Sequence, residues 1–277
     1  MSDEEPYRVV LLSKAGVGRQ KREVLRGLAA SDDIEVAGIV VEDMIHGSSS
    51  EYVRTLLHKI ARRRGRGYPV RAYNAARDVF GTLLGSLPTP EGTDGDPRSE
   101  DGPDRASLTN VSLIEVSDML SEHAQERIEA LDPDLGIVWG TRILPPRIFD
   151  VPTDGSIGVH AGKIPEYRGG PAGFWELYHG EREAGVTVQD LNEELDAGQI
   201  VRQETVPIER GDSPADVRAR QDGITADLVV EAVRGLKDGT LEPRDWDGEK
   251  RPVNTPPTIP QLVRFRIRQR GRRSVET

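Results

Sequence analysis

Short apolar runs alternate with amphipathic stretches along most of the chain. Runs typical of buried strands cover residues 8–12 (RVVLL), 34–41 (IEVAGIVV) and 134–139 (DLGIVW). Between the first two runs, a turn of small residues leads into apolar positions at helical spacing around residues 24–28. The order of strand, turn, helix and strand is typical of a parallel sheet, so the pattern predicts an α/β fold.

The same alternation continues through the second half of the chain. It predicts three more strands, at residues 111–116, 155–160 and 185–192, and three helices, at residues 121–131, 173–180 and 212–236. The last helix has a clear start, because Asp212 and Ser213 are both good N-cap residues before Pro214.

Two segments depart from this pattern. Residues 88–107 are rich in Pro, Gly and acidic residues and have almost no apolar side chains, so we predict a disordered insertion. Residues 241–277 are rich in Pro and Arg, with six arginines in the last 14 positions, and we predict an extended tail. The folded domain is therefore expected over residues 7–240, with further helical spacing in residues 50–86.

The composition narrows the classes of function. The chain has 47 acidic and 37 basic side chains and a formal net charge of −10, which argues against stable nucleic-acid binding by the folded body. It has no cysteine, which excludes disulfides, thiolate nucleophiles and cysteine-ligated metals. The start of the chain lacks a signal-peptide pattern, and no apolar stretch approaches the roughly 18 residues that span a bilayer. We expect a cytoplasmic protein without a transmembrane segment, and the oligomeric state stays open.

One histidine and one carboxylate stand where acid–base chemistry would need them. His160 ends the predicted strand 155–160, and Asp196 follows 36 residues later, after a predicted helix and strand. If the segment between them is a βαβ unit, both side chains reach the same edge of the sheet. An imidazole and a carboxylate at one edge can move protons near neutral pH. The alternatives are a structural histidine and a turn or solvated carboxylate.

Other polar motifs allow binding roles. Arg168, in the turn at residues 167–171, either holds an anionic group of a substrate or braces its loop. Gly16 and Gly18 precede a predicted helix, whose N-terminus could cradle a phosphate. The third glycine of a dinucleotide fingerprint is missing, which disfavours NAD. The histidines show no spacing that indicates a metal site.

Residues 160–169 (HAGKIPEYRG) carry a resemblance to a known family. The segment resembles the formyltransferases, which take a formyl group from 10-formyltetrahydrofolate. Residues 185–188 (GVTV) and 195–200 (LDAGQI) resemble the next two blocks of that family, in the same order. Residues 139–144 (WGTRIL) resemble the segment whose backbone holds the pterin.

The resemblance covers about residues 7–236 and implies a fold and a set of site residues. The implied fold is a Rossmann-like, mostly parallel α/β sheet with helices on both faces. His160 and Asp196 match the catalytic histidine and aspartate. The residues implied to bind the formyl donor are Thr141, Arg142, Ile143, Leu144, Glu194 and Leu195, and those implied to bind the substrate are Ser13, Gly16 and Arg168.

The implied activity is formyl transfer to the amine of a small molecule. An amino sugar nucleotide is our first expectation for the acceptor, because residues 166–171 (EYRGGP) and 174–178 (FWELY) resemble the sugar-linked members. A methionyl-tRNA acceptor is less expected, since only about 40 residues follow the last predicted helix. No metal is implied.

Gly158 departs from the family pattern. Family members have an asparagine two positions before the histidine, where it stabilises the developing oxyanion. The loss of one such donor typically costs about 10²–10³ in rate. Three explanations follow: Lys163 or Thr141 replaces the donor, the enzyme uses a different acyl donor or acceptor, or the protein binds folate or a nucleotide without catalysis.

Overall fold

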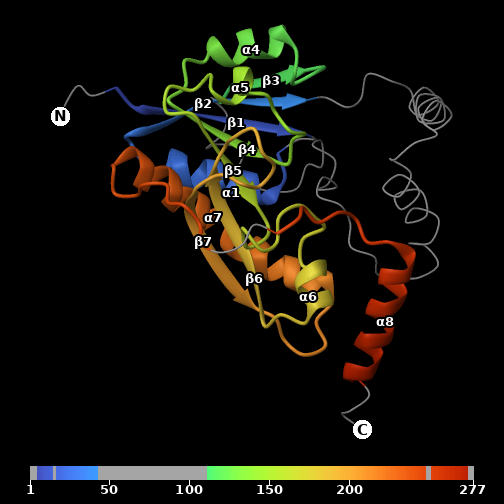
Figure 1. Cartoon of the computed structure of the whole chain (residues 1–277). Coiled ribbons are helices and arrows are strands. Elements are labelled where there is room, and N and C mark those ends of the chain that lie inside the picture. The colour runs from blue at the N-terminus through green and yellow to red at the C-terminus, as the bar shows by residue number, and fades with distance from the viewer. Residues whose placement is uncertain (1–4, 15–16, 43–110, 248–250, 274–277) are drawn as a thin grey trace, which may run out of the picture.

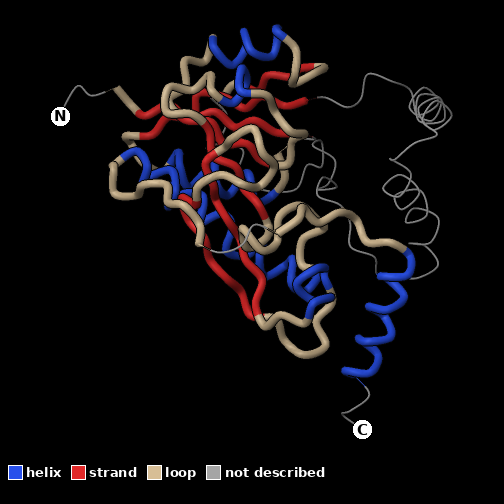
Figure 2. The backbone as a smooth tube through the Cα atoms, viewed as in Figure 1, coloured by secondary structure: helices blue, strands red, loops and turns tan. Residues whose placement is uncertain are grey.

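The central element of the fold is a twisted sheet. The computed structural model describes residues 5–14, 17–42, 111–247 and 251–273, and of residues 270–273 it describes the backbone alone. Within these residues the strands are β1 (Tyr7–Lys14), β2 (Ile34–Glu42), β3 (Leu113–Val116), β4 (Leu135–Trp139), β5 (Ser156–His160), β6 (Glu183–Asp190) and β7 (Ile200–Pro207). Their order across the sheet is β3-β2-β1-β4-β5-β6-β7 (Figures 1 and 2).

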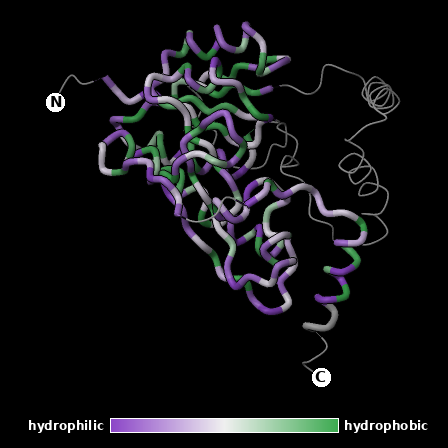
Figure 3. Tube along the Cα trace, viewed as in Figure 1, coloured by the Kyte–Doolittle hydropathy of each residue, from purple (hydrophilic) through white to green (hydrophobic). Residues whose placement is uncertain are grey.

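Helices cover both faces of this sheet. The described helices are α1 (Arg19–Ala29), α4 (Glu122–Glu129), α5 (Pro146–Phe149), α6 (Phe174–His179), α7 (Pro214–Lys237) and α8 (Ile259–Arg273). On one face, Leu28 of α1 and Val229 of α7 share a core with Ile137 of β4. On the other face, Ile128 of α4 and Ile148 of α5 complete a second core. Figure 3 shows the apolar residues concentrated along the inner strands, so the predicted α/β fold with helices on both faces is confirmed.

The chain changes direction across the sheet between β1 and β4. From β1 it passes outward through β2 to β3, and it then returns to β4 on the other side of β1. Such a reversal opens a crevice at the carboxyl ends of the strands, where α/β proteins bind ligands. Ser13 of β1 pairs with Trp139 of β4 at this point.

The predicted βαβ unit between His160 and Asp196 is wrong. β6 follows α6 but runs antiparallel to β5, with Ile157 opposite Asp190 and His160 opposite Thr187. β6 therefore ends beside the start of β5, and residues 191–199 bring Asp196 back to His160. The pattern of apolar residues reports which face is buried, but it does not report the direction of a strand.

The extended tail predicted over residues 241–277 is also wrong, because part of it is helix α8. The ring of Phe265 in α8 packs on that of Phe174 in α6, with centroids 4.9 Å apart. Arg268 donates a hydrogen bond to the backbone oxygen of Tyr178 at 3.1 Å. Apolar residues within the arginine-rich sequence therefore dock this helix on the fold.

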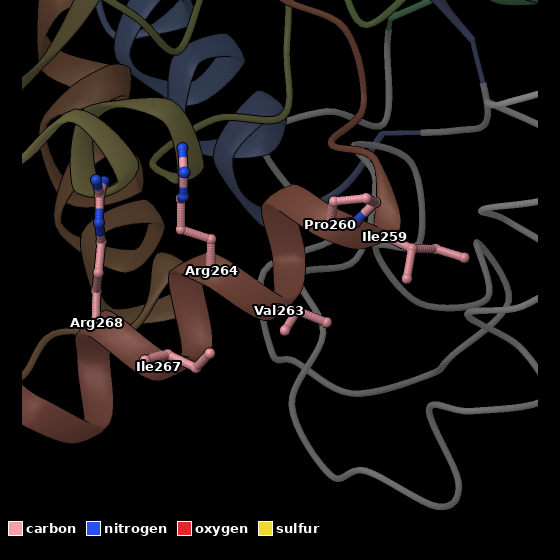
Figure 4. Close-up of a pocket in the computed structure, with 6 residues that line it drawn as sticks. All are labelled: Ile259, Pro260, Val263, Arg264, Ile267 and Arg268. Atoms are coloured by element: carbon pink, nitrogen blue, oxygen red, sulfur yellow. The ribbon is translucent and has the colours of Figure 1, made fainter.

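A shallow groove of about 630 Å³ runs along α8. Figure 4 shows its lining residues, which are Ile259, Pro260, Val263, Arg264, Ile267 and Arg268. None of the site residues predicted from the sequence lies among them. The groove is therefore separate from the candidate active site.

Three remaining expectations concern α7, the membrane and the insertion. Ser213, one of the two N-cap residues expected from the sequence, is the N-cap of α7. A capping box also joins it reciprocally to Asp216. No helix in the described ranges is both long enough and apolar enough to cross a membrane. The predicted insertion at residues 88–107 and the helical spacing in residues 50–86 lie outside the described residues.

Candidate active site

The end of β5 and the facing part of β6 present polar side chains on one face of the sheet. Gly158 lies opposite Gln189 and His160 lies opposite Thr187, and opposed residues of an antiparallel pair point to the same face. The alternating apolar residues of both strands belong to the core shared with α1 and α7: Ile157, Val159, Val186 and Val188. Loops cover the polar face, as the hydrogen bond from Thr187 Oγ1 to the Gly162 oxygen shows at 2.7 Å.

The His160 ring is held by a backbone carbonyl. Its Nε2 lies 2.7 Å from the oxygen of Tyr167, and a carbonyl only accepts, so Nε2 carries the hydrogen. A side chain on Gly162 would destroy this contact, because a Cβ there would lie 2.4 Å from His160 Nε2. The carbonyl therefore fixes the ring orientation and directs Nδ1 toward Asp196.

Asp196 accepts hydrogen bonds on both carboxylate oxygens. Its Oδ2 accepts the Gly169 N–H at 2.8 Å and lies 3.5 Å from His160 Nδ1. Its Oδ1 accepts from Gln189 Nε2 at 3.3 Å. The His160 and Asp196 side chains are only 11% and 15% exposed, so the Asp196 carboxylate would interact with a protonated imidazole with little screening by water.

The loop that carries Asp196 is tightly constrained. Asp196 itself has a φ of +47°, which is uncommon for any residue except glycine. A Cβ at Gly198 would lie 1.7 Å from the Asp190 oxygen, so only glycine fits there. This close approach lets the chain turn back from the end of β6 toward His160.

Arg168 braces this loop. Its side chain is 3% exposed, and its Nε donates to the Asp196 oxygen at 2.8 Å and to the Leu195 oxygen at 3.1 Å. Its Nη2 also pairs with Glu194 Oε1 at 3.0 Å. Of the two roles expected for Arg168, these contacts favour the brace, because the guanidinium is buried and is used by the Glu194 carboxylate and by the backbone oxygens of residues 195 and 196.

The C-terminal segment before α8 supports Arg168 from the other side. The Asn254 N–H donates to the Arg168 oxygen at 2.8 Å, and the Gly170 N–H donates to the Asn254 oxygen at 3.3 Å. The Trp175 indole donates to the Thr255 oxygen at 3.1 Å. The segment predicted to be a free tail thus forms part of the frame around the site.

Gln189 belongs to the site and was missed by the sequence analysis. It is 2% exposed and contacts both Asp196 and the Gly198 N–H, which its Oε1 accepts at 3.1 Å. The available signal was its place in the strand 185–192, where a buried carboxamide at an inward position needs polar partners.

Glu176 of α6 is a second buried carboxyl near His160. It is 2% exposed, and burial raises its pKa to about 7. Hydrogen bonds from the backbone of Gly173 and of Glu176 itself, and the positive charge of His160, oppose this rise in pKa without cancelling it. The site therefore contains a carboxyl group that titrates near neutral pH.

Comparison with known sequences identifies the family. The sequence profile described as formyl transferase matches residues 83–233, which is more than half of the chain. The chain belongs to the formyltransferase family. The resemblance seen in the sequence is therefore confirmed.

Curated relatives of this formyltransferase-family protein include methionyl-tRNA formyltransferases. That of Chlorobium chlorochromatii is 33% identical over 142 residues, covering 50% of this chain and 45% of the relative. That of Macrococcus caseolyticus is 34% identical over 136 residues, covering 49% of this chain and 44% of the relative. The chain thus spans about half the length of the curated relatives that it matches.

Solved structures share the fold. Glycinamide ribonucleotide transformylase 1 from Symbiobacterium toebii superposes with a TM-score of 0.57 at 18% identity, covering 88% of this chain and 100% of that chain. A sugar N-formyltransferase from a Shewanella species superposes with a TM-score of 0.57 at 15% identity, covering 94% of this chain and 86% of that chain. The sheet and helices described above are therefore the formyltransferase fold.

The segment predicted to hold the formyl donor follows β4. Within the described part of the chain, the N–H groups of residues 140–144 make no hydrogen bond to other residues. Ile143 is 62% exposed, whereas Leu144 is buried. Arg142 pairs with the buried carboxylate of Glu42, which also accepts the Met119 N–H at 3.2 Å. This ion pair fixes the segment to the end of β2.

One of the predicted substrate-binding residues, Ser13, lies at the switch in strand order, where it pairs with Trp139. Ser13 is buried at the end of β1 and accepts a hydrogen bond from Lys21 Nζ at 2.8 Å. Lys21 also lies 5.9 Å from the centre of the Trp139 ring, which adds an unpredicted cation to this crevice. Gly16 lies outside the described residues.

Replacement of Arg168 tests the proposed brace. Arg168→Lys should lower the free energy of unfolding by about 2–3 kcal/mol, because an ammonium cannot reproduce the forked set of bonds. Arg202→Lys is the control, since Arg202 on β7 forms a partly exposed pair with Glu231 and should change stability by less than about 1 kcal/mol. Urea unfolding measures both, and equal losses would contradict a specific role for Arg168.

Replacement of Glu176 tests the raised pKa. Between pH 4.5, its unperturbed pKa, and about 7, the folded protein binds a proton that the unfolded chain releases. The free energy of unfolding should therefore fall as the pH rises through this window, by up to about 3 kcal/mol.

Glu176→Gln should remove that fall, so the variant gains stability over wild type above pH 7. Urea unfolding at several pH values measures the effect, with the exposed Glu193→Gln as a control. Parallel pH profiles for wild type and Glu176→Gln would show that the carboxyl is not perturbed.

Proposed function

We propose that this protein transfers a formyl group from 10-formyltetrahydrofolate to the amine of a small substrate. The observation that carries the proposal is the His160–Asp196 pair, 3.5 Å apart at the end of β5 in a chain of the formyltransferase family. General acid–base chemistry is what transfer to an amine requires.

The reaction exchanges one carbon–nitrogen bond for another. The amine nitrogen attacks the formyl carbon, a new C–N bond forms, and the carbonyl oxygen gains negative charge. The bond between the formyl carbon and N10 of the folate then breaks. N10 takes one proton and the acceptor amine loses one, so no acyl-enzyme is needed.

The geometry suggests how the two side chains share this proton movement. His160 Nε2 is held by the Tyr167 carbonyl, so the nitrogen that can exchange a proton is Nδ1, on the side of Asp196. Asp196 stabilises the imidazolium that forms when Nδ1 takes a proton. His160 can then return a proton as general acid.

The formyl donor would lie along residues 140–144. Their N–H groups are available for the polar edge of a pterin, and the exposed Ile143 offers it apolar contact. Glu194 and Leu195 are exposed on the loop next to Asp196, which supports their assignment to the same ligand. The residues present therefore fit a reduced folate.

The acceptor would lie at the switch point between β1 and β4. Lys21 and Ser13 place a cation and a hydroxyl there, which favours a substrate with an anionic group such as a nucleotide phosphate. An amino sugar nucleotide combines such a phosphate with an amine, and we propose it as the acceptor class.

A second candidate function is binding without catalysis. The observation that favours it is Gly158, which lacks the side chain of the family's asparagine. Under this alternative the protein binds a reduced folate or a nucleotide but does not transfer the formyl group.

Replacement of His160 separates the two functions. Wild type should transfer labelled formyl to an amine panel that includes amino sugar nucleotides, and His160→Ala should lose at least about 10² in kcat. Isothermal titration with a reduced folate should give similar affinities for both proteins. His179→Ala, at an exposed histidine of α6, is the control and should retain activity.

Two results would contradict the proposal. Folate binding without turnover in wild type would support the binding alternative. Full activity in His160→Ala would remove the histidine from the mechanism.

A further inference from the structure

The two substitute donors considered from the sequence, Lys163 and Thr141, both have other partners. Lys163 Nζ lies 3.8 Å from Glu166 Oε1 and 3.6 Å from Glu183 Oε1. The Thr141 hydroxyl donates to the Arg142 oxygen at 2.8 Å. Both groups therefore interact with other residues, which directs the search for the missing donor to the strand that pairs with β5.

Gln189 lies directly across the strand pair from Gly158. The two residues are opposed in the antiparallel register, so the Gln189 side chain leaves the sheet on the same face as a side chain at position 158 would. The Cγ of Gln189 is 3.7 Å from the place where a Cβ on Gly158 would be. The carboxamide therefore lies next to the space that the family's asparagine would fill.

The orientation of this carboxamide is fixed by its partners. Oε1 accepts the Gly198 N–H at 3.1 Å, which only an oxygen can do. Nε2 must then point to Asp196 Oδ1, at 3.3 Å. Nε2 carries two hydrogens, and within the described residues it makes this one hydrogen bond, so its second N–H has no partner among them.

The Asp196 carboxylate contacts both the His160 imidazole and the Gln189 amide. His160 Nδ1 lies 3.5 Å from Asp196 Oδ2, and Gln189 Nε2 is bound to Oδ1. Gln189 is 2% exposed, so the second N–H is held in a site that largely excludes water. A fixed donor in such a place is the arrangement that stabilises a developing oxyanion.

We propose that the Gln189 carboxamide is the oxyanion donor of this enzyme and replaces, from β6, the side chain that Gly158 lacks on β5. The inference rests on the proposed formyl transfer. When the amine attacks, the second N–H of Gln189 donates to the formyl oxygen as it becomes negative. Asp196 holds the amide through its first N–H and so couples the donor to the acid–base pair.

The test uses variants that separate donation from packing. Gln189→Glu keeps the shape and the acceptor for the Gly198 N–H but removes both N–H donors. It should lower kcat about 10²–10³-fold while the affinity for a reduced folate, from isothermal titration, stays close to wild type. Gln199→Glu is the matched control, since Gln199 is exposed and bonds to Asp245 on the surface, and it should keep full kcat.

A rescue experiment distinguishes the donor from a residue that only positions Asp196. Gln189→Ala removes the carboxamide and vacates the space beside Gly158. Adding Gly158→Asn to this variant restores an amide in that space and should recover at least about tenfold in kcat. The new Cβ would lie 2.8 Å from Leu191 Cδ2, so Leu191→Ala is included in a parallel set to give it room.

The outcomes distinguish this inference from the proposed function. Suppose that wild type turns over. An unchanged kcat in Gln189→Glu, or no rescue by Gly158→Asn in either set, would then overturn the role of Gln189. The proposed formyl transfer would stand in both cases. No turnover in wild type but turnover in Gly158→Asn would likewise overturn the role of Gln189, because the donor would then be absent from the natural chain. No turnover in either protein would overturn the proposed function and the inference with it.

Discussion

The Asp196 carboxylate organises the candidate site, and the buried guanidinium of Arg168 keeps it in place. The carboxylate contacts the imidazole of His160, the amide of Gln189 and the backbone of Gly169. Its loop adopts a strained backbone, with a φ of +47° at Asp196, and such strain persists only when the surroundings determine it. Arg168 holds this backbone conformation in place, because its guanidinium donates hydrogen bonds to the backbone oxygens of residues 195 and 196.

The frame extends well beyond the motif that carries the resemblance. The C-terminal segment pairs with the Arg168–Gly170 turn, and α8 anchors that segment through Phe265 on α6. Elements far apart in the sequence thus converge on one loop. This arrangement explains why residues outside the motif matter for the position of the Asp196 carboxylate.

The sequence was sufficient to predict the α/β fold, the family and the pair of His160 and Asp196. Apolar runs and turn residues indicate where strands and helices lie, and within the described residues the structure confirms the predicted strands and helices. Strand β7 and the short helix α5 were not predicted. The direction of β6 was not predictable, because alternation of apolar and polar residues is the same for parallel and antiparallel pairs. Helix α8 was not predicted, because arginines outnumber the few apolar residues, such as Phe265, that pack on the rest of the fold.

The roles of Arg168 and Gln189 required the structure for a different reason. Arg168 binds a loop that is distant in the sequence, and an arginine in a turn is compatible with either a substrate or a brace. Gln189 lies beside Gly158 only because β5 pairs with β6. Gly158 was visible as a departure from the family, but the compensating carboxamide is on the neighbouring strand. Only the register of β5 against β6 shows that the two positions share one space.

The most direct measurement is the rate of formyl transfer from 10-formyltetrahydrofolate to an amine by wild type and by Asp196→Asn. Asparagine keeps the shape and an oxygen for the Gly169 N–H, but it removes the charge that pairs with His160. The account predicts measurable turnover in wild type and a loss of at least about 10²-fold in kcat for Asp196→Asn, with the fold and folate binding retained. Equal turnover in the two proteins, or none in wild type, would contradict it.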